Sequence, residues 1–301
     1  MKLLITGATG LIGRELTQKL IYEGFEVNYL TTRKSKINSL KGANGFFWNH
    51  NQIDSECFSE VDTIVHLAGS TVSRRWTKSY KDEIYSSRIN STQILLKGLK
   101  NVKESHQVKQ LVSASAIGIY PSDFDYNFNE EAKINPTSFM ERVVFDWEKE
   151  VNSFRSEGVK IAKLRIGLVL SKKGGVLGTL KIPTYLGLGA AFGDGTQGQS
   201  WIHMDDLLGI FLKAILDKWE GVFNTVAPNP VNQTKLMSAL SYSLKKPYFL
   251  PPIPSFLIKI VAGEMSNLVL DSHWVSSNKV IDYGYSFKYS DIKKAINDLI
   301  G

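Results

Sequence analysis

The stretch Gly7-Ala8-Thr9-Gly10-Leu11-Ile12-Gly13 decides the fold of this chain. It follows the apolar run Lys2–Thr6, which is typical of a buried strand. It opens a pattern in which Ile12, Leu16 and Leu20 recur every fourth residue, as on one face of a helix. A strand, a glycine-rich turn and a helix in this order are typical of dinucleotide-binding domains. The stretch therefore predicts a cofactor phosphate site at the start of an α/β domain.

Each glycine of this loop has a separate predicted role. Gly7 permits the tight turn, Gly10 lets backbone N–H groups approach a pyrophosphate, and Gly13 allows the helix to pack closely on the strand. The helix N-terminus adds unpaired N–H groups and the positive end of the helix dipole. The residues expected to contact the cofactor here are Thr6, Gly7, Thr9, Gly10, Leu11, Ile12 and Gly13.

The first 167 residues alternate β-rich runs with amphipathic stretches, which predicts a Rossmann-type, doubly wound parallel sheet covered by helices. A long helix is expected from Ser79 to Leu99. The expected strands are Lys2–Thr6, Glu26–Thr31, Thr63–Leu67, Gln110–Ser113 and Lys160–Arg165.

Glycine becomes frequent after Gly167, and prolines gather at residues 228–254. We therefore expect a dinucleotide-binding domain over residues 1–167. A substrate lobe and C-terminal domain should follow over residues 168–301, with elements that return to the main sheet.

The end of the second expected strand favours NADP(H) over NAD(H). NAD-binding domains usually place an acidic residue there to bond the ribose hydroxyl. This chain instead has Thr32, Arg33 and Lys34, and no acidic residue occurs between Glu26 and Asp54. The two cations could hold a 2′-phosphate. The alternative is that they form an exposed loop pair.

Composition restricts the partners of the protein. The 301 residues are 43% hydrophobic and 22% charged, as in a globular protein. Cys57 is the single cysteine, which excludes an internal disulfide and a cysteine-based zinc cluster, and no metal site is expected. No signal peptide is expected, and prolines and Lys259 interrupt the apolar stretch from Leu250 to Ala262. These features predict a soluble, cytoplasmic protein with no membrane partner.

The net charge of +7 lies mostly in the second half of the chain. Residues 1–150 hold 19 basic and 18 acidic side chains, against 17 and 11 in residues 151–301. Such an excess can attract a phosphorylated small molecule. The basic residues are scattered along the chain, so a nucleic-acid partner is not expected. An anionic substrate agrees with this distribution, and a solvated surface is the alternative.

Further motifs occur in order along the chain, and together they resemble a known group. The chain is similar to the atypical extended short-chain dehydrogenases/reductases (SDRs) called "epimerase family" or sugar-nucleotide epimerase-like proteins, which have a small C-terminal domain of their own. Bacterial proteins and a plastid relative linked to chloroplast division belong to this group. Besides the glycine loop, the motifs are His66–Gly69, Arg75-Trp76, Ser87-Arg88, Ser113–Gly118, Trp147-Glu148, Ser200–His203 with Asp205-Asp206, and Gly263–Met265.

The resemblance implies roles for particular residues. Ser115 would orient the reacting carbonyl or hydroxyl group, and Trp201 and His203 would line the substrate pocket. Alternatively Trp201 and His203 simply pack, and Asp205 caps a helix that begins near Asp206. The implied cofactor contacts beyond the glycine loop are His66, Leu67, Ala68, Gly69, Arg88, Ser113, Ala114, Arg165, Ile166 and Gly167.

The usual acid–base pair of these enzymes, Tyr-x-x-x-Lys on one helix face, is absent. The corresponding positions hold Phe139 and Val143, neither of which can transfer a proton. Tyr120 is the expected proton donor in their place. Glu148 could act as a carboxylate base, and Arg88 and Lys81 could reach the cofactor ribose or phosphates, each with a structural role as the alternative.

Two functions stay open from the sequence. The first is an NADP(H)-dependent oxidoreductase or epimerase that acts on a small substrate, with a nucleotide-linked sugar as one candidate. The second is a non-catalytic NADP(H)-binding regulator, for example in cell or organelle division. The sequence does not fix the oligomeric state, and a homo-oligomer is compatible with it.

Overall fold

The computed structural model describes residues 1–49, 51–102 and 106–301. Its centre is a seven-stranded sheet in the order β12-β7-β5-β4-β1-β2-β3, in which every neighbouring pair is parallel. The strand order reverses beside β1, so the sheet is doubly wound and the predicted Rossmann-type α/β fold is confirmed. The strands are β1 (Lys2–Thr6), β2 (Glu26–Thr31), β3 (Asn44–Phe47), β4 (Thr63–His66), β5 (Gln110–Ala116), β7 (Lys160–Ile166) and β12 (Gly221–Thr225).

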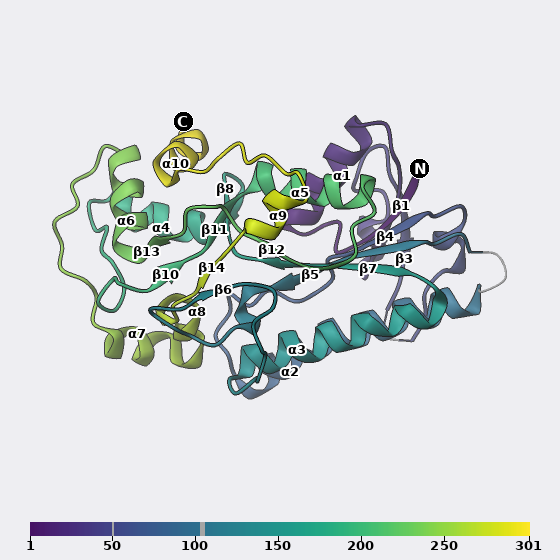
Figure 1. Cartoon of the computed structure of the whole chain (residues 1–301), viewed down its shortest axis with the longest axis horizontal. Helices are drawn as coiled ribbons and strands as arrows, with labels where there is room; N and C mark the ends of the chain where they lie inside the picture. Colours follow the sequence, from purple (N-terminus) through teal and green to yellow (C-terminus); the bar gives the residue numbers. More distant parts are fainter. Residues whose placement is uncertain (50, 103–105) are drawn as a thin grey trace.

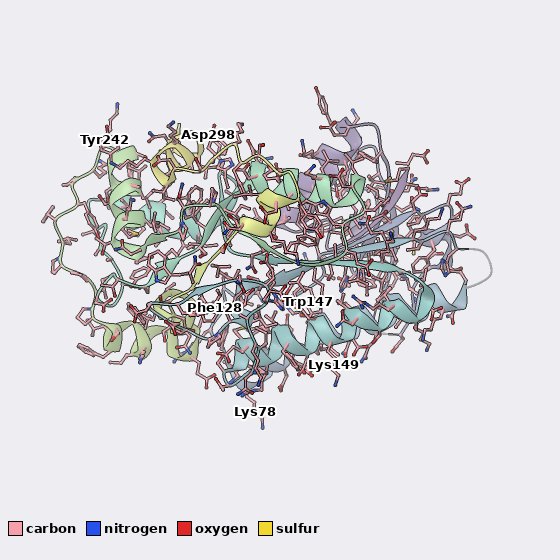
Figure 2. All side chains as sticks on the ribbon, viewed as in Figure 1. Lys78, Phe128, Trp147, Lys149, Tyr242 and Asp298 are labelled. Atoms are coloured by element: carbon pink, nitrogen blue, oxygen red, sulfur yellow. The ribbon has the colours of Figure 1, made fainter. Side chains whose placement is uncertain are left out.

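Helices cover both faces of this sheet (Figure 1). Helices α1 (Leu11–Tyr22) and α5 (Met204–Leu216) lie on one face, and α2 (Lys78–Asn101) and α3 (Phe139–Asn152) lie on the other. Each pair packs with the sheet around its own apolar core. Figure 2 shows Lys78 and Lys149 on the outer side of α2 and α3, whereas the buried Trp147 lies between α3 and the sheet.

The predicted elements agree closely with the observed ones. Strands β1 and β2 have the predicted bounds, whereas β5 extends three residues further, to Ala116. The predicted long helix is α2, which begins at Lys78 and ends at Asn101. Strands β3 and β12 lack a clear apolar run and were not expected. Both are edge strands, which the sheet recruits through backbone pairing.

A lobe built mostly from residues after 167 packs at the end of the sheet remote from the N-terminus (Figure 1). It has an apolar core of its own, and α5 and β12 return from it to the sheet. The proposed division at residues 167 and 168 stays a prediction. The lobe helices are α4 (Val176–Tyr185), α6 (Gln233–Ser243), α7 (Ser255–Ala262), α8 (Asn267–Leu270) and α10 (Ile292–Ile300), whereas α9 (Asn278–Asp282) packs beside β12 of the central sheet.

Short strands and turns complete the described structure. The small strands are β6 (Asn127–Phe128), β8 (Leu168–Ser171), β9 (Gly174–Gly175), β10 (Gly198–Gln199), β11 (Trp201–His203), β13 (Val231–Asn232) and β14 (Trp274–Val275). The 3₁₀ turns are η1 (Lys34–Lys36), η2 (Ser55–Phe58), η3 (Ile117–Ile119), η4 (Ser153–Glu157) and η5 (Gly263–Ser266). Among the described residues, no helix has the length and apolar character needed to cross a bilayer.

Candidate functional site

The glycine loop lies between β1 and α1, where two of its glycines are required by the fold itself. Gly7 has a φ of +69°, and a Cβ there would lie 2.6 Å from the Leu67 carbonyl oxygen. A Cβ on Gly13 would lie 2.2 Å from the Gly7 carbonyl oxygen. Both distances are far below a normal van der Waals contact, so any side chain at either position would displace the backbone.

Gly10 is different, because a side chain there would need a shift of only a few tenths of an ångström. Its φ of −80° and ψ of −177° are available to any residue, and a Cβ would meet only the Gly7 carbonyl oxygen, at 3.2 Å. Gly10 is the N-cap of α1 and lies exposed at its N-terminus. The absence of a side chain leaves the first N–H groups of α1 open to an anion. This cradle fits the pyrophosphate that the sequence predicts.

A buried hydrogen-bond chain fixes the segment opposite the loop, at the ends of β1 and β4. Thr6 Oγ1 accepts from the backbone N–H groups of Leu67 and Ala68, both at 3.1 Å, and lies 2.8 Å from His66 Nδ1. Because this hydroxyl already accepts twice, it donates to His66 Nδ1. The ring hydrogen is then on Nε2, which donates to Thr92 Oγ1 at 3.0 Å. Thr6 and His66 therefore hold residues 67 and 68 in place.

The side chain of His66 has a structural role. The ring is fully buried, and burial followed by the Arg88 charge lowers its pKa to about 3. It is therefore neutral at physiological pH. The cofactor contacts expected at residues 66–69 stay predictions, and only backbone atoms of His66 could take part in them.

Arg88 lies on α2 beside the end of β4. One guanidinium nitrogen, Nη1, donates to the carbonyl oxygens of Ser70 and Ile84, and the group lies 5.4 Å from the Trp147 ring centroid. Burial lowers its pKa to about 10, so it stays charged at neutral pH. None of the ion pairs in the described part of the chain includes Arg88. This cation suits the predicted contact with the cofactor ribose or phosphates.

The cations expected to select NADP(H) lie at the end of β2. Thr32, Arg33 and Lys34 are exposed, and Arg33 is the N-cap of the turn η1. Lys34 Nζ lies 5.4 Å from the Phe47 ring centroid, and no ion pair of the described residues includes Arg33 or Lys34. Both positive charges are therefore free to meet an anion.

A pocket of about 380 Å³ lies over the glycine loop. The β8–β9 hairpin forms its far wall, where Lys173 pairs with Glu15 of α1 at 2.7 Å. This hairpin contact was not predicted, because nothing in the sequence joins residue 173 to α1. The lining residues are Thr9, Gly10, Leu11, Arg14, Glu15, Lys173, Gly174 and Gly175.

A buried polar network lies where β5 and β7 end. Ser115 Oγ donates to Glu148 Oε1 at 2.6 Å, and Arg165 donates to both oxygens of Glu148, at 2.8 and 3.1 Å. Lys163 Nζ adds a second cation 3.4 Å from Glu148. Burial raises the pKa of the Glu148 carboxyl, but these cations and hydrogen bonds outweigh it, so the pKa lies below its usual value. Glu148 is therefore a carboxylate that holds the Ser115 hydroxyl.

Tyr120 joins the same network through Arg165. Its hydroxyl accepts from Arg165 Nη1 at 2.8 Å and donates toward Asn224 Oδ1 at 2.8 Å and the Asn129 carbonyl oxygen at 3.0 Å. The side chain is 1% exposed, and burial raises the pKa of the phenol, which Arg165 and Asn224 only partly offset. The proton-donor role of Tyr120 stays a prediction, and these contacts favour the packing alternative.

An apolar cluster occupies the place of the missing acid–base pair. Val143 is buried against Tyr80 and Ile84 of α2. Phe139 packs edge-on against Trp76, with ring centroids 5.4 Å apart. Lys81 Nζ lies 4.6 Å from the Phe139 ring centroid and pairs with Glu264 at 2.6 Å, on the rim of a pocket of about 420 Å³. Lys81 is thus engaged in an ion pair, and the helix face itself offers no proton donor.

The remaining predicted cofactor residues lie on the ends of β5 and β7. Ser113 and Ala114 are buried in β5, and Ser113 Oγ donates to the Ala114 carbonyl oxygen. Ile166 ends β7, and a Cβ on Gly167 would lie 2.2 Å from the Ser200 carbonyl oxygen. The structure therefore brings these residues to the carboxyl ends of the strands, where the glycine loop also lies. Their contacts with a cofactor stay predictions.

Trp201 and His203 lie in β11, with 0% and 1% of their surfaces exposed. Trp201 Nε1 donates to the Asn229 carbonyl oxygen, and His203 Nδ1 accepts from the Asp205 N–H. His203 is thus the N-cap of α5, which begins at Met204, so the alternative that Asp205 is the cap is wrong. These contacts favour packing and capping for both residues, and their role in a substrate pocket stays a prediction.

Asp206 is a structural anchor that the sequence analysis did not identify. Its side chain is buried and accepts from the Tyr285 hydroxyl and from the N–H groups of Lys288 and Tyr289, at 2.8–3.0 Å. It fixes the C-terminal segment to α5 across 79 to 83 residues of chain. Only the Asp205-Asp206 motif pointed to this position.

Comparison with known protein families agrees with this geometry. The model of the NAD dependent epimerase/dehydratase family matches residues 3–225, and the model of a domain of unknown function, DUF1731, matches residues 253–299. An epimerase family protein of Staphylococcus aureus (strain MRSA252) is 35% identical over 298 residues, which cover 99% of this chain and 98% of that protein. One from Staphylococcus saprophyticus is 36% identical over the same shares.

Solved structures share the fold over the whole chain. The human epimerase family protein SDR39U1, crystallised with NADPH, has a TM-score of 0.87 and 25% identity, and the match covers 100% of this chain and 99% of that one. A nucleoside-diphosphate sugar epimerase from Corynebacterium glutamicum has a TM-score of 0.80 and 31% identity, over 100% of this chain and 58% of that one.

Proposed function

Because the chain belongs to the NAD dependent epimerase/dehydratase family of extended SDRs, we propose that it binds NADP(H) and acts as an oxidoreductase or epimerase on a small anionic substrate. Gly10 carries this proposal. A Cβ at Gly10 would meet a single tight contact, at 3.2 Å, and the glycine leaves the N-terminus of α1 without a side chain beside the ends of β1 and β4. Binding of a phosphate by this turn would explain why no side chain is present at Gly10.

The charges at the end of β2 support NADP(H) as the cofactor. Arg33 and Lys34 are exposed and outside any described ion pair, and no carboxylate occurs between Glu26 and Asp54. The human relative was crystallised with NADPH. A charge-assisted contact to the 2′-phosphate would favour NADP(H) by ~1.5–3 kcal/mol.

Ser115 is the residue proposed to contact the reacting oxygen of the substrate. A bound nicotinamide would supply hydride donor and acceptor chemistry. The Ser115 hydrogen is directed to Glu148, which leaves the oxygen lone pairs of Ser115 free to accept from a substrate hydroxyl. Glu148, held by Arg165, would act as the positioning residue for Ser115.

Tyr120 is kept as the proposed proton donor, because it is the phenol joined to Ser115 through Arg165 and Glu148. Its hydroxyl is bonded on both sides, so it could reach a substrate only after the segment after β5 moves. A lost general acid lowers a rate by ~10²- to 10⁴-fold. Tyr120→Phe and Ser115→Ala should therefore reduce turnover strongly, while cofactor affinity stays unchanged.

The test is a steady-state screen of sugar nucleotides and small carbonyl compounds with NADPH and NADP⁺. Calorimetry on the same protein measures cofactor affinity as the control. Full activity of Tyr120→Phe would show that Tyr120 only packs. Full activity of Ser115→Ala would remove Ser115 from the chemistry.

A non-catalytic NADP(H)-binding regulator is the second candidate, and the apolar cluster around Phe139 and Val143 favours it. A protein that only binds the cofactor needs no acid–base pair. Tight NADP(H) binding without turnover of any compound in the screen would support this candidate over the enzyme.

A further inference from the structure

Large apolar side chains are concentrated on one end of the lobe. Ten of the twenty-one large hydrophobic residues exposed in the described structure lie on residues 182–188 and 249–261. The most exposed are Ile182, Leu186, Phe249, Phe256, Ile260 and Val261, with exposed fractions between 60% and 76%. Scattered exposed apolar residues are normal, but a concentrated patch marks an interaction surface.

Helix α7 carries the largest part of this patch. None of its eight residues is buried, although Phe256, Leu257, Ile260 and Val261 are all large and apolar. The helix lies on the outside of the lobe, at the end of the molecule remote from the N-terminus (Figure 1). A short apolar helix that packs so little against its own chain gains little stability from the fold.

The chain that leads into α7 runs beside the end of α4 and the residues that follow it. The Ile253 N–H donates to the Ala191 carbonyl oxygen at 2.8 Å, and the Gly193 N–H donates to the Ile253 carbonyl oxygen at 2.9 Å. Lys246 Nζ lies 4.6 Å from the Tyr185 ring centroid. The end of α4 and the chain that leads into α7 therefore lie side by side.

The segments that form this surface carry positively charged side chains and no negatively charged ones. No acidic residue occurs between Glu157 and Asp194 or between Glu220 and Glu264. The patch segments and their flanks carry Lys181, Lys245, Lys246 and Lys259. Of the carboxylates that follow, Glu264 is paired with Lys81, and Asp271 lies near Lys259. Apolar side chains mixed with lysines are typical of a surface that lies in the headgroup region of an anionic bilayer.

We propose that this face, formed by residues 182–188 and 249–261, binds the surface of an anionic lipid bilayer. A second copy of the chain is the less favourable occupant, because a two-fold contact brings the same face, and hence the same lysines, together. The expectation of no membrane partner rested on the absence of a spanning segment, which a surface contact does not need. The proposal does not depend on the cofactor site, because none of these residues lines the pocket over the glycine loop.

The test is co-sedimentation of the full chain with vesicles of equimolar phosphatidylcholine and phosphatidylglycerol, compared with phosphatidylcholine alone. Binding should require the anionic lipid. Ile260→Glu should weaken it about tenfold or more, since the burial of one aliphatic side chain in the bilayer is lost. Lys245→Gln and Lys246→Gln should each weaken it about fivefold. Tyr22→Glu, at an 89% exposed position on the end of α1, is the matched control and should bind as the wild type does.

Circular dichroism and NADPH affinity confirm that each variant is folded. The proposal is overturned if the wild type does not sediment with anionic vesicles, or if Ile260→Glu binds them as the wild type does. It is also overturned if sedimentation velocity shows a wild-type dimer that Ile260→Glu dissociates while vesicle binding is absent. That result would assign the face to a second copy of the chain.

Discussion

Gly10 and Gly13 lie about one helical turn apart, and substitutions at the two positions should affect different properties. A side chain at Gly10 should disturb cofactor binding, whereas a side chain at Gly13 should disturb folding. A Cβ on Gly13 would lie 2.2 Å from the Gly7 carbonyl oxygen, whereas one on Gly10 would lie 3.2 Å from the same atom. Gly10→Ala should therefore fold with a loss of stability within about 1 kcal/mol, yet lose NADPH affinity at least ~tenfold. Gly13→Ala should lose ~1–3 kcal/mol or more of stability through overpacking.

Urea unfolding and calorimetric titration of the two variants measure these effects separately. Undiminished NADPH binding by Gly10→Ala would contradict the assignment of the loop as the phosphate site. Wild-type stability of Gly13→Ala would show that α1 can move away from β1 at little cost.

Thr6 and Thr17 are both fully buried, but only one of them is hydrogen-bonded. Thr6 Oγ1 bonds Leu67, Ala68 and His66, whereas Thr17 Oγ1 has no partner in the described structure. Thr6→Val should destabilise the protein by on the order of 3 kcal/mol, because it leaves the buried Ala68 N–H and His66 Nδ1 unpaired, whereas the Leu67 N–H keeps the Thr6 carbonyl oxygen. Thr17→Val, the matched control, should be neutral or stabilising by about 1 kcal/mol. Equal free energies of unfolding for the two variants would contradict the stabilising role of this hydrogen-bond network.

At the scale of elements, the sequence predicts best those helices and strands whose own residues carry the signal. The periodicity of Ile12, Leu16 and Leu20 in α1 is such a local signal. Contacts between distant segments leave no such signal. The β8–β9 hairpin reaches α1 through Lys173 and Glu15, which are 158 residues apart. This is why the glycine loop could be predicted and the wall of its pocket could not.

Asp206 ties two elements together in a way that its neighbour Asp205 does not. Asp206 is buried and accepts three hydrogen bonds from residues 285–289, whereas Asp205 forms an exposed ion pair with Lys288. Asp206→Asn should cost about 2–3 kcal/mol, because one oxygen that accepts an N–H becomes a donor. Asp205→Asn should stay within about 0.5 kcal/mol of the wild type. Thermal unfolding and hydrogen exchange at residues 285–289 measure both, and protection unchanged in Asp206→Asn would show that apolar packing alone docks the segment.

At the scale of the whole molecule, the strand order predicts where a ligand lies better than it predicts what reacts. The order reverses beside β1, and ligands of doubly wound sheets bind at that point. The glycine loop, Arg33 and Arg88 all lie around the strand ends there, as the sequence indicates. The chemistry depends on side-chain contacts instead: the buried positions of Tyr120 and Glu148 follow from how α3 packs on β5 and β7, which no residue pattern records.

Selection between NADP(H) and NAD(H) should be visible in the stability of the whole molecule. A ligand that binds only the folded state stabilises it by about 2.7 kcal/mol at a concentration one hundred times its dissociation constant. At equal concentrations, NADPH should therefore raise the unfolding temperature more than NADH does, and added salt should reduce the difference. The double replacement Arg33→Ala with Lys34→Ala should remove the difference and leave the NADH effect unchanged. Lys235→Ala, which removes an exposed lysine of α6, is the matched control and should keep the difference. The proposed contact requires that Arg33 and Lys34 lie where the 2′-phosphate of NADPH is held. Equal shifts of the unfolding temperature with NADPH and NADH in the wild type would therefore mean that Arg33 and Lys34 are only a solvated pair.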